Sequence, residues 1–408
     1  MVDQSELAWR ILSRRHGAEL CYTPMFHARL FAENEKYRKD MWSAVDGDPE
    51  VDRPLVVQFC ANDPETLLAA ARHVEDKCDA VDLNLGCPQG IARRGHYGSF
   101  LMEDWDLVYS LINILHRNLK VPVTAKIRVF DDREKTLAYA RKVLSAGAQF
   151  LTIHGRTRDM KGQKTGLADW NTIRYVRDNL PAGTVVFGNG NVLYPEDIPR
   201  CIDHTTVDAV MSAEANLYNP AVFADTAGGV DKDVHFPRVD VMLREYFGIV
   251  QQHPTEANLS ALKSHFFKIL RPFFAVHTEI RNDTGRMSKA SLDEWDAIVR
   301  RVEAKVAEIY AAGCDDSVVD DADEDTATYS DKARTCWGGR YRTIPYWRCQ
   351  PYFRKVDGQV LKGAETEVRP KDKGPKEPAV PAKRPTDGAE SARPAPAPPT
   401  DTAEEMAA

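Results

Sequence analysis

The sequence predicts an α/β protein built on a parallel sheet, and two features of the chain carry that prediction. From residue 19 to about residue 225, short apolar or β-branched segments alternate with longer segments of helical periodicity. The short segments are continuously apolar rather than alternating, as expected for parallel strands buried on both faces. Strand followed by helix, repeated in this way, is typical of a parallel α/β sheet.

Seven segments are expected to be strands. Helix-start signals separate them, such as Asp63-Pro64-Glu65 before TLLAAARHV and Pro195-Glu196-Asp197 before IPRCI. In chain order, the strand segments are ELCYTPM from Glu19, PLVVQFCAN from Pro54, AVDLNLGCP from Ala80, VPVTAKIRV from Val121, AQFLTIHGRT from Ala148, GTVVFGNG from Gly183 and VDAVMSAEANL from Val207.

A helix is predicted from Ser5 to Arg15, ahead of the first of these strands, with Gly17 ending it. A (β/α)8 TIM barrel has eight strands, each followed by a helix. We therefore predict a TIM barrel whose first strand lies upstream of Met1. A doubly wound sheet of seven strands is the alternative, but no glycine-rich fingerprint opens its first helix.

Composition divides the chain into four expected parts. Residues 1–235 form the barrel, and residues 240–312 form a small domain of helices only. Residues 313–368 are an acidic linker followed by a short aromatic segment. Residues 369–408 are rich in Pro, Ala, Lys and Glu and lack aromatic residues, which predicts a disordered tail.

Charge and cysteine usage narrow the class of protein. The net charge of −7 argues against a uniformly basic nucleic-acid coat, although a local basic face remains compatible with it. No apolar run approaches the roughly 20 residues of a membrane span. The eight cysteines form no CxxC pair, which favours a reducing compartment, and Cys336 and Cys349 lack the ligand spacing of a zinc site. We expect a cytoplasmic or nuclear monomer without metal.

The segment NLGCPQG places Cys87 at the end of a strand, where barrel enzymes carry their sites. A buried cysteine is often only a small hydrophobic residue, and that alternative stays open for a single thiol. The loop that follows contains three glycines and the adjacent residues Arg93 and Arg94, so it is expected to be mobile and able to meet phosphate.

Two further strands end in basic residues. Lys126 lies inside the apolar segment TAKIR, where it could be a base, a Schiff-base amine, a counter-charge for an anionic cofactor, or the partner of a carboxylate. His154, Arg156 and Arg158 follow at a spacing of two, which favours one common side of the strand. A structural histidine is the alternative for His154.

The last two strands end in GNGN, residues 188–191, and MSAEAN, residues 211–216. Loops at these positions of a barrel commonly bind a phosphate through backbone N–H groups. An Asn-Gly pair alone is more often a turn.

These motifs carry a resemblance to a known family. In order and spacing, CYTPM, QFCAND, NLGCPQG, AKIR, HGRTR, GNGN and AEANLYNP resemble the dihydrouridine synthases. The likeness is greatest to eukaryotic members that act on tRNA positions 16 and 17, and it covers about residues 1–312. The segment PYWRCQPY is similar as well.

The resemblance implies an FMN cofactor in the barrel. Met1 and Val2 would be the remainder of a Pro-Met-Val motif that touches FMN, and Gly-Arg of bacterial relatives is replaced by Ala213-Glu214. The implied cofactor-binding residues are Met1, Val2, Gln58, Lys126 and His154, with Asn189, Gly190, Asn191, Ala213 and Glu214 at the phosphate end.

The resemblance also implies the reaction: NADPH or NADH reduces FMN, and reduced FMN gives a hydride to carbon 6 of a tRNA uracil. Cys87 is expected to protonate carbon 5, because a cysteine with the usual pKa of about 8.5 is mostly protonated near neutral pH. Asn84 and Arg156 are expected to bind the substrate, whose base must leave its stack.

The helical part is expected to bind the tRNA. Residues 259–290 contain six Lys or Arg and two acidic residues, a local charge of +4, with Lys268 and Arg271 among the cations. A solvated helix face explains the charge equally well. Two other functions stay open: a flavin barrel acting on a free pyrimidine, and a tRNA-binding protein without catalysis.

Overall fold

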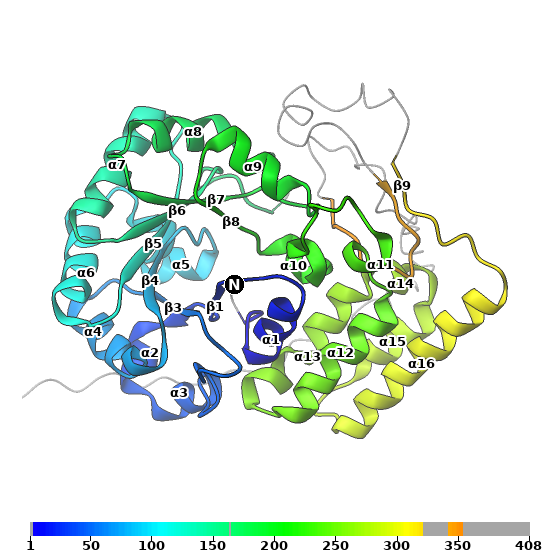
Figure 1. Ribbon diagram of the computed structural model, residues 1–408. Helices are drawn as coiled ribbons and strands as arrows, with labels where there is room; N and C mark the ends of the chain where they lie inside the picture. The colour runs from blue at the N-terminus through cyan, green and yellow to red at the C-terminus, as the bar shows by residue number, and fades with distance from the viewer. Residues whose placement is uncertain (1–2, 163–164, 321–341, 354–408) are drawn as a thin grey trace, which may run out of the picture. The chain divides into compact units, whose positions relative to one another are not determined.

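The computed structural model describes residues 3–162, 165–320 and 342–353, all within one compact unit, Met1–Glu367. Its centre is a parallel sheet in the order β1-β3-β4-β5-β6-β7-β8, with β2 also pairing with β3 (Figure 1). β1 lies within the predicted segment that begins at Glu19, and β2 directly follows that segment; both pair in parallel with β3. The strands are β1 (Cys21–Tyr22), β2 (Phe26–His27), β3 (Leu55–Cys60), β4 (Ala80–Leu85), β5 (Val123–Arg128), β6 (Phe150–His154), β7 (Val185–Asn189) and β8 (Ala209–Met211).

All seven predicted strand segments are therefore confirmed, and helices follow the strands as the barrel prediction requires. Figure 1 shows the helices of the repeat along the outer side of the curved sheet. Among the described strands β1 and β8 form the edges of the sheet. The helices of this part are α2 (Ala28–Glu33), α3 (Glu35–Met41), α4 (Pro64–Arg72), α5 (Gly90–Gly95), α6 (Trp105–Asn118), α7 (Arg133–Ser145), α8 (Trp170–Asn179), α9 (Asp197–Thr205) and α10 (Glu214–Tyr218).

The helix starts follow from the sequence signals. The Asp63 side chain accepts a hydrogen bond from the Thr66 N–H at the start of α4, and Pro64 occupies the first turn, where its missing N–H costs nothing. The buried side chains of the strands and of the helices that cover them form one core cluster. That cluster keeps the sheet rigid up to the carboxyl ends of its strands.

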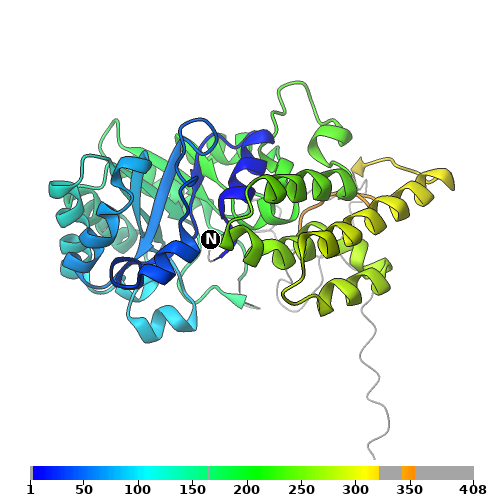
Figure 2. The same ribbon diagram turned by 90° about the horizontal axis from the view of Figure 1, so that it is seen from below.

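A second core cluster joins the first helix, α1 (Leu7–Arg15), to the helices downstream of the sheet. Leu7, Trp9 and Leu12 of α1 are buried in it, and α1 packs on α12 and α13. Figures 1 and 2 both show α1 between the sheet and these helices. The downstream helices are α11 (Lys232–His235), α12 (Val239–Gln252), α13 (Glu256–Ile269), α14 (Arg271–Val276), α15 (Thr278–Arg286) and α16 (Leu292–Ala311).

The chain returns to this second cluster after α16. Strand β9 (Val319–Asp320) pairs with β10 (Arg342–Thr343), which opens the aromatic segment. Trp347 and Cys349 of that segment are buried in the second cluster. The described helices include none with the length and apolar character of a membrane span.

Candidate active site

Polar side chains occupy alternate positions near the carboxyl ends of the central strands. On β4, Asp82 is paired in register with Gln58 of β3 and with Thr124 of β5. Two residues further on, Asn84 is paired with Lys126. Residues i and i+2 of a strand face the same side of a sheet, so these polar side chains share one face. The residues between them face the other way and belong to the first core cluster, which the covering helices complete.

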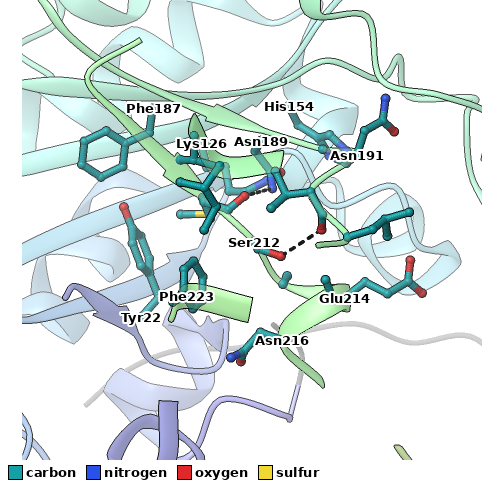
Figure 3. Close-up of a pocket in the computed structure, with 18 of the residues that line it drawn as sticks. Tyr22, Lys126, His154, Phe187, Asn189, Asn191, Ser212, Glu214, Asn216 and Phe223 are labelled. Carbon is teal, nitrogen blue, oxygen red and sulfur yellow. Dashed lines mark hydrogen bonds between the residues drawn. The ribbon is translucent and has the colours of Figure 1, made fainter. Parts of the chain in front are cut away.

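A cavity of about 1130 Å³ lies at this end of the sheet. The rings of Tyr22, Phe187 and Phe223 line it on one side, as Figure 3 shows. The described residues predicted at the cofactor, the uracil and the reacting atoms all line it: Gln58, Asn84, Cys87, Lys126, His154, Arg156, Asn189, Gly190, Asn191, Ala213 and Glu214.

Two of the predicted residues that the structure describes are not among those that line the cavity. Lys268 lies on α13 over the ring of Tyr218, and Arg271, the first residue of α14, lies over the ring of Tyr352, which does line the cavity. Met1 and Val2 lie outside the described residues.

The loop that carries Cys87 is held by hydrogen bonds on both sides. Oδ1 of Asn84 accepts from the N–H groups of Gly86 and Cys87 at 3.0 and 2.9 Å. The carbonyl of Cys87 accepts from the Ser99 hydroxyl at 3.0 Å. Gly98 has φ +64°, and a Cβ at that position would lie 2.7 Å from the Cys87 carbonyl oxygen. Cys87 therefore borders the cavity on a fixed backbone, while it also packs in a small buried cluster that includes Cys60 and Tyr97.

Arg128 also holds this loop, and sequence reasoning missed it. Its Nε donates to the carbonyl of Gly86 at 2.6 Å, and its Nη1 donates to the carbonyl of Thr157 at 2.8 Å. The residue follows Lys126 at the same two-residue spacing that places side chains on one face. That spacing was the signal that could have found it.

A chain of hydrogen bonds connects the buried carboxylate of Asp82 to the Cys87 loop. Asp82 accepts from the Thr124 hydroxyl at 2.7 Å and from Nε2 of Gln58 at 2.8 Å. Oε1 of Gln58 accepts from Nδ2 of Asn84 at 2.9 Å, which turns Oδ1 of Asn84 toward the loop. Burial raises the pKa of Asp82 to about 6. Asp82 was not among the residues predicted from the sequence, although a carboxylate in an apolar strand, two residues before Asn84, is a visible signal.

Lys126 reaches across the sheet to Asn189, and Figure 3 shows the two side chains meeting in the cavity. Its Nζ donates to Oδ1 of Asn189 at 2.8 Å, while Nδ2 of Asn189 donates to the carbonyl of Met211. Burial lowers the pKa of Lys126 to about 7, with Arg128 acting in the same direction. No described carboxylate forms an ion pair with this amine, so the alternative of a Lys–carboxylate pair is wrong within the described residues.

His154 and Arg156 form a second polar group at the cavity. Nη1 of Arg156 lies 3.0 Å from Nε2 of His154, and its Nη2 donates to Oδ1 of Asn191 at 2.8 Å. Because a guanidinium only donates, Nε2 accepts and the ring proton lies on Nδ1. Burial holds the pKa of His154 well below its usual value, and Lys126 and Arg156 act in the same direction. The imidazole is therefore neutral.

The loop after β7 approaches the cavity closely with its backbone. Gly190 has φ +114°, and a Cβ there would lie 2.6 Å from the Cβ of Ala168. Its carbonyl accepts from Nε1 of Trp170 at 2.9 Å. Side chains are thus excluded at this point, and main-chain groups form the wall. Figure 3 shows the Glu214 carboxylate extending away from the Lys126–Asn189 pair.

Among the described residues, no group of three or more His, Cys, Asp or Glu side chains is placed to hold a metal ion. Cys336 lies outside the described residues, and Cys349 is buried in the second core cluster.

The model of one protein family, described as dihydrouridine synthase (Dus), matches residues 1–312. The chain belongs to the dihydrouridine synthase family. Three curated relatives are of the same kind. The chain is 64% identical over 361 residues to the tRNA-dihydrouridine(16/17) synthase [NAD(P)(+)] of Saccharomyces cerevisiae, which covers 88% of this chain and 83% of the relative.

Two further members of the dihydrouridine synthase family are each 45% identical to this chain. The tRNA-dihydrouridine(16/17) synthase [NAD(P)(+)] of Schizosaccharomyces pombe matches over 92% of both chains. The tRNA-dihydrouridine(16/17) synthase [NAD(P)(+)]-like protein of Mus musculus matches over 87% of this chain and 67% of its own length. These matches extend past residue 312, the end of the family model, because they cover more of the chain.

Proposed function

We propose that this protein reduces uridine in tRNA to dihydrouridine, with NADPH or NADH as the reductant. The names of its relatives support the substrate and the nicotinamide. The structural observation that supports the reaction is a single cavity bordered by the Cys87 thiol and by the buried Lys126 amine. The Lys126 amine is held by its bond to Asn189, and the backbone that carries the Cys87 thiol is held by its bond to Asn84, so both positions are set before a substrate enters.

FMN is the cofactor that the residues of the cavity fit. At about 1130 Å³ the cavity exceeds the roughly 300–1,000 Å³ of ordinary ligand sites, which leaves space for a nucleobase beside a flavin. An aromatic side and a polar floor suit a planar ring with polar edges. When bound, FMN would supply hydride transfer. Gln58, Lys126 and His154 would hold its ring system, and residues 189–191, 213 and 214 its phosphate end.

The residues of the protein then have separate tasks. Cys87 would hold the proton that carbon 5 of the uracil receives, and Asn84 would face the edge of the base. Lys126 would offset negative charge near the flavin pyrimidine, an interaction strengthened by burial. Arg156 contacts His154 and Asn191, so it would hold these two side chains in position next to the substrate.

Lys268 and Arg271 are the cations we propose for tRNA phosphate. Of the four other basic residues in this region, Lys263 donates to the carbonyls of Gly285 and Met287, and Arg286 pairs with Asp283, so the charge of these two is partly used within the protein. Lys268 and Arg271 are preferred to Arg281 and Lys289 because Arg271 lies over the ring of Tyr352, which lines the cavity, and Lys268 lies over the ring of Tyr218. Neither Lys268 nor Arg271 forms an ion pair with any described residue.

The deciding experiment is reduction of a defined tRNA by the purified protein. We expect a yellow protein whose flavin is bleached by NADPH and recovers its colour on addition of unmodified tRNA, with dihydrouridine appearing in the RNA. A flavin-free protein that binds tRNA would support the binding-only alternative. Turnover of free uracil at the same rate as tRNA would support a small-molecule enzyme.

A further inference from the structure

The described residues 342–353, which we call the C-terminal strap, are fixed to the second core by Arg348. The Arg348 side chain is 1% exposed and pairs with Asp316 and with Asp233, the latter at 2.7 Å. Its Nη1 donates to the carbonyls of Phe236 and Lys232 at 2.8 and 3.1 Å. A buried arginine with this many partners defines the position of the backbone around it.

The backbone of the strap is also paired with the segment before α12. The N–H of Val239 donates to the carbonyl of Trp347 at 2.9 Å, and the N–H of Cys349 donates to the carbonyl of Pro237 at 2.8 Å. Three residues after Cys349, Tyr352 reaches the cavity and lines it. The anchoring therefore delivers one aromatic residue to the candidate active site.

Tyr352 belongs to a compact cluster with Tyr218 and Arg271, whose guanidinium also lies 5.9 Å from the centroid of the Tyr218 ring. Its ring centroid is 5.0 Å from that of Tyr218, with an angle of 38° between the rings. The guanidinium of Arg271 lies over the same ring, 3.7 Å from its centroid. Lys268 completes the group, since its Nζ lies 4.5 Å over the Tyr218 ring and donates to the Tyr218 hydroxyl at 3.0 Å.

Arg271 is exposed, and no carboxylate of the described chain pairs with it or with Lys268. Because the guanidinium already rests against the Tyr352 ring, a ligand that contacts it costs little further side-chain freedom. Two positive charges beside aromatic rings match the chemistry of a nucleotide: a base that stacks and a phosphate that carries charge.

We propose that the cluster of Tyr218, Tyr352 and Arg271 is a second nucleotide subsite, adjoining the uridine cavity, which binds an unpaired base next to the uridine that is reduced. This inference rests on the proposed function. An extruded uridine leaves its neighbours without their stacking partner, and an arginine plane backed by a tyrosine replaces that contact. Lys268 and Arg271 neutralise the connecting phosphates.

The test is tRNA binding by the full-length holoprotein, measured separately from dihydrouridine formation. Tyr352→Ala should weaken tRNA binding about tenfold, within the range of base stacking on an aromatic residue. Tyr352→Phe should bind as the wild type does, because the ring remains. Tyr346→Ala is the matched control, since Tyr346 is a tyrosine of the same strap that packs on Phe273 and His277 and does not line the cavity.

Arg271→Lys separates the flat guanidinium from its charge. The variant keeps the positive charge, so the salt dependence of binding should stay that of the wild type, while affinity falls about fivefold through loss of stacking. Wild-type affinity for Arg271→Lys and Tyr352→Ala overturns the subsite. An equal loss in Tyr346→Ala and Tyr352→Ala also overturns it, because the strap would then be only structural.

The same titrations distinguish this inference from the proposed function. If the wild-type protein binds tRNA but forms no dihydrouridine, the proposed reaction fails while the subsite is still measured. If dihydrouridine forms normally and Tyr352→Ala binds tRNA normally, the reaction stands and the subsite fails. Flavin reduction by NADPH without tRNA should be unchanged in Tyr346→Ala, because Tyr346 does not line the cavity.

Discussion

Lys126 and Asn189 meet through a hydrogen bond of 2.8 Å, although β6 separates the two strands from which they extend. Side chains from alternate strands fill the same layer inside a barrel, which brings β5 and β7 into contact. The bond fixes a buried amine at the floor of the cavity. Because the amine is buried in this place and its pKa is lowered, its protonation contributes to the pH dependence of the unfolding free energy, which can be measured.

Replacement of Lys126 by Met should flatten the pH dependence of stability. The folded-state pKa of Lys126 is about 7 and its ordinary value is 10.5, so between these values the unfolded chain binds more protons. Stability attributable to this residue therefore rises with pH across that window and is constant below it. Between pH 7 and 9 the difference in unfolding free energy between wild type and Lys126→Met should change by on the order of 2 kcal/mol. Chemical denaturation of the flavin-free proteins measures it; parallel curves would contradict the buried amine.

Replacement of Cys87 by Ala should abolish product formation without affecting the reductive half of the reaction. Loss of a general acid typically costs about 100-fold or more in rate. Flavin reduction by NADPH should proceed at the wild-type rate, while dihydrouridine in the tRNA falls by that factor. Cys60→Ala is the control, since Cys60 is buried close to Cys87 but does not line the cavity. Normal dihydrouridine formation by Cys87→Ala would remove the assignment.

The hydrogen-bond chain from Asp82 to the Cys87 loop should be needed for rate more than for folding. Asp82→Ala leaves Nε2 of Gln58 and the Thr124 hydroxyl without their acceptor, at a cost of about 1–3 kcal/mol in stability. The freed Gln58 and Asn84 no longer fix the loop, so kcat should fall by about tenfold or more. Asp82→Asn keeps one acceptor oxygen, so its stability and its kcat should lie between those of the wild type and those of Asp82→Ala. Thermal melting and single-turnover rates of the pair check this; a loss of stability with unchanged kcat would reduce Asp82 to a structural residue.

Gly98→Ala should displace the Cys87 loop. Alanine is strained at φ +64°, and its Cβ would lie 2.7 Å from the Cys87 carbonyl oxygen, so we expect a loss of roughly 2 kcal/mol and reduced activity. Gly90→Ala is a matched control in the same region, because no atom lies within 4 Å of a Cβ there. The two melting temperatures and the two rates should separate clearly. Equal behaviour would show that the loop adapts without consequence.

Reversal of charge at Lys268 and Arg271 should weaken tRNA binding in a salt-dependent manner. Affinity falls as salt rises, and each phosphate contact contributes about 0.7 to 0.9 to the steepness of log affinity against log salt. The double variant Lys268→Glu, Arg271→Glu should therefore show a slope that is shallower by about 1.5 or more. Arg286→Glu is the control for net charge, because Arg286 is exposed and already paired with Asp283. Fluorescence titrations at several salt concentrations give the slopes. An unchanged slope would place the phosphate contacts elsewhere.

The sequence predicted the repeat of the fold and most of the cavity, because both depend on local patterns. Continuous apolar runs identified the strands, and the polar residues at their ends marked Asn84, Lys126 and His154. What it could not give were contacts that depend on register between strands or on distant segments. Asp82 gains its role only when Gln58 lies opposite it. Tyr352 reaches the cavity only because Arg348 is fixed by Asp316 and Asp233.

The predicted helix at the start of the chain was confirmed, but its packing was not foreseeable. The apolar side of α1 gives no sign that its neighbours are α12 and α13 rather than the strands beside it in the sequence. The periodicity of apolar residues shows which face of a helix is buried, but it does not show which element packs against that face.

The packing of α1 on distant helices means that its native contacts can form only late in the synthesis of the chain. The N–H of Ala8 bonds to the side chain of Asn258, 250 residues further along the chain. At roughly 5–20 residues per second, a ribosome needs about 12 to 50 s to make that partner. Throughout this interval the apolar side of α1 lacks its native neighbours α12 and α13, although the strands of the sheet, which precede those helices in the sequence, can already pair. Transiently exposed apolar surface favours aggregation, so the growing chain carries this risk until α12 and α13 have been synthesised.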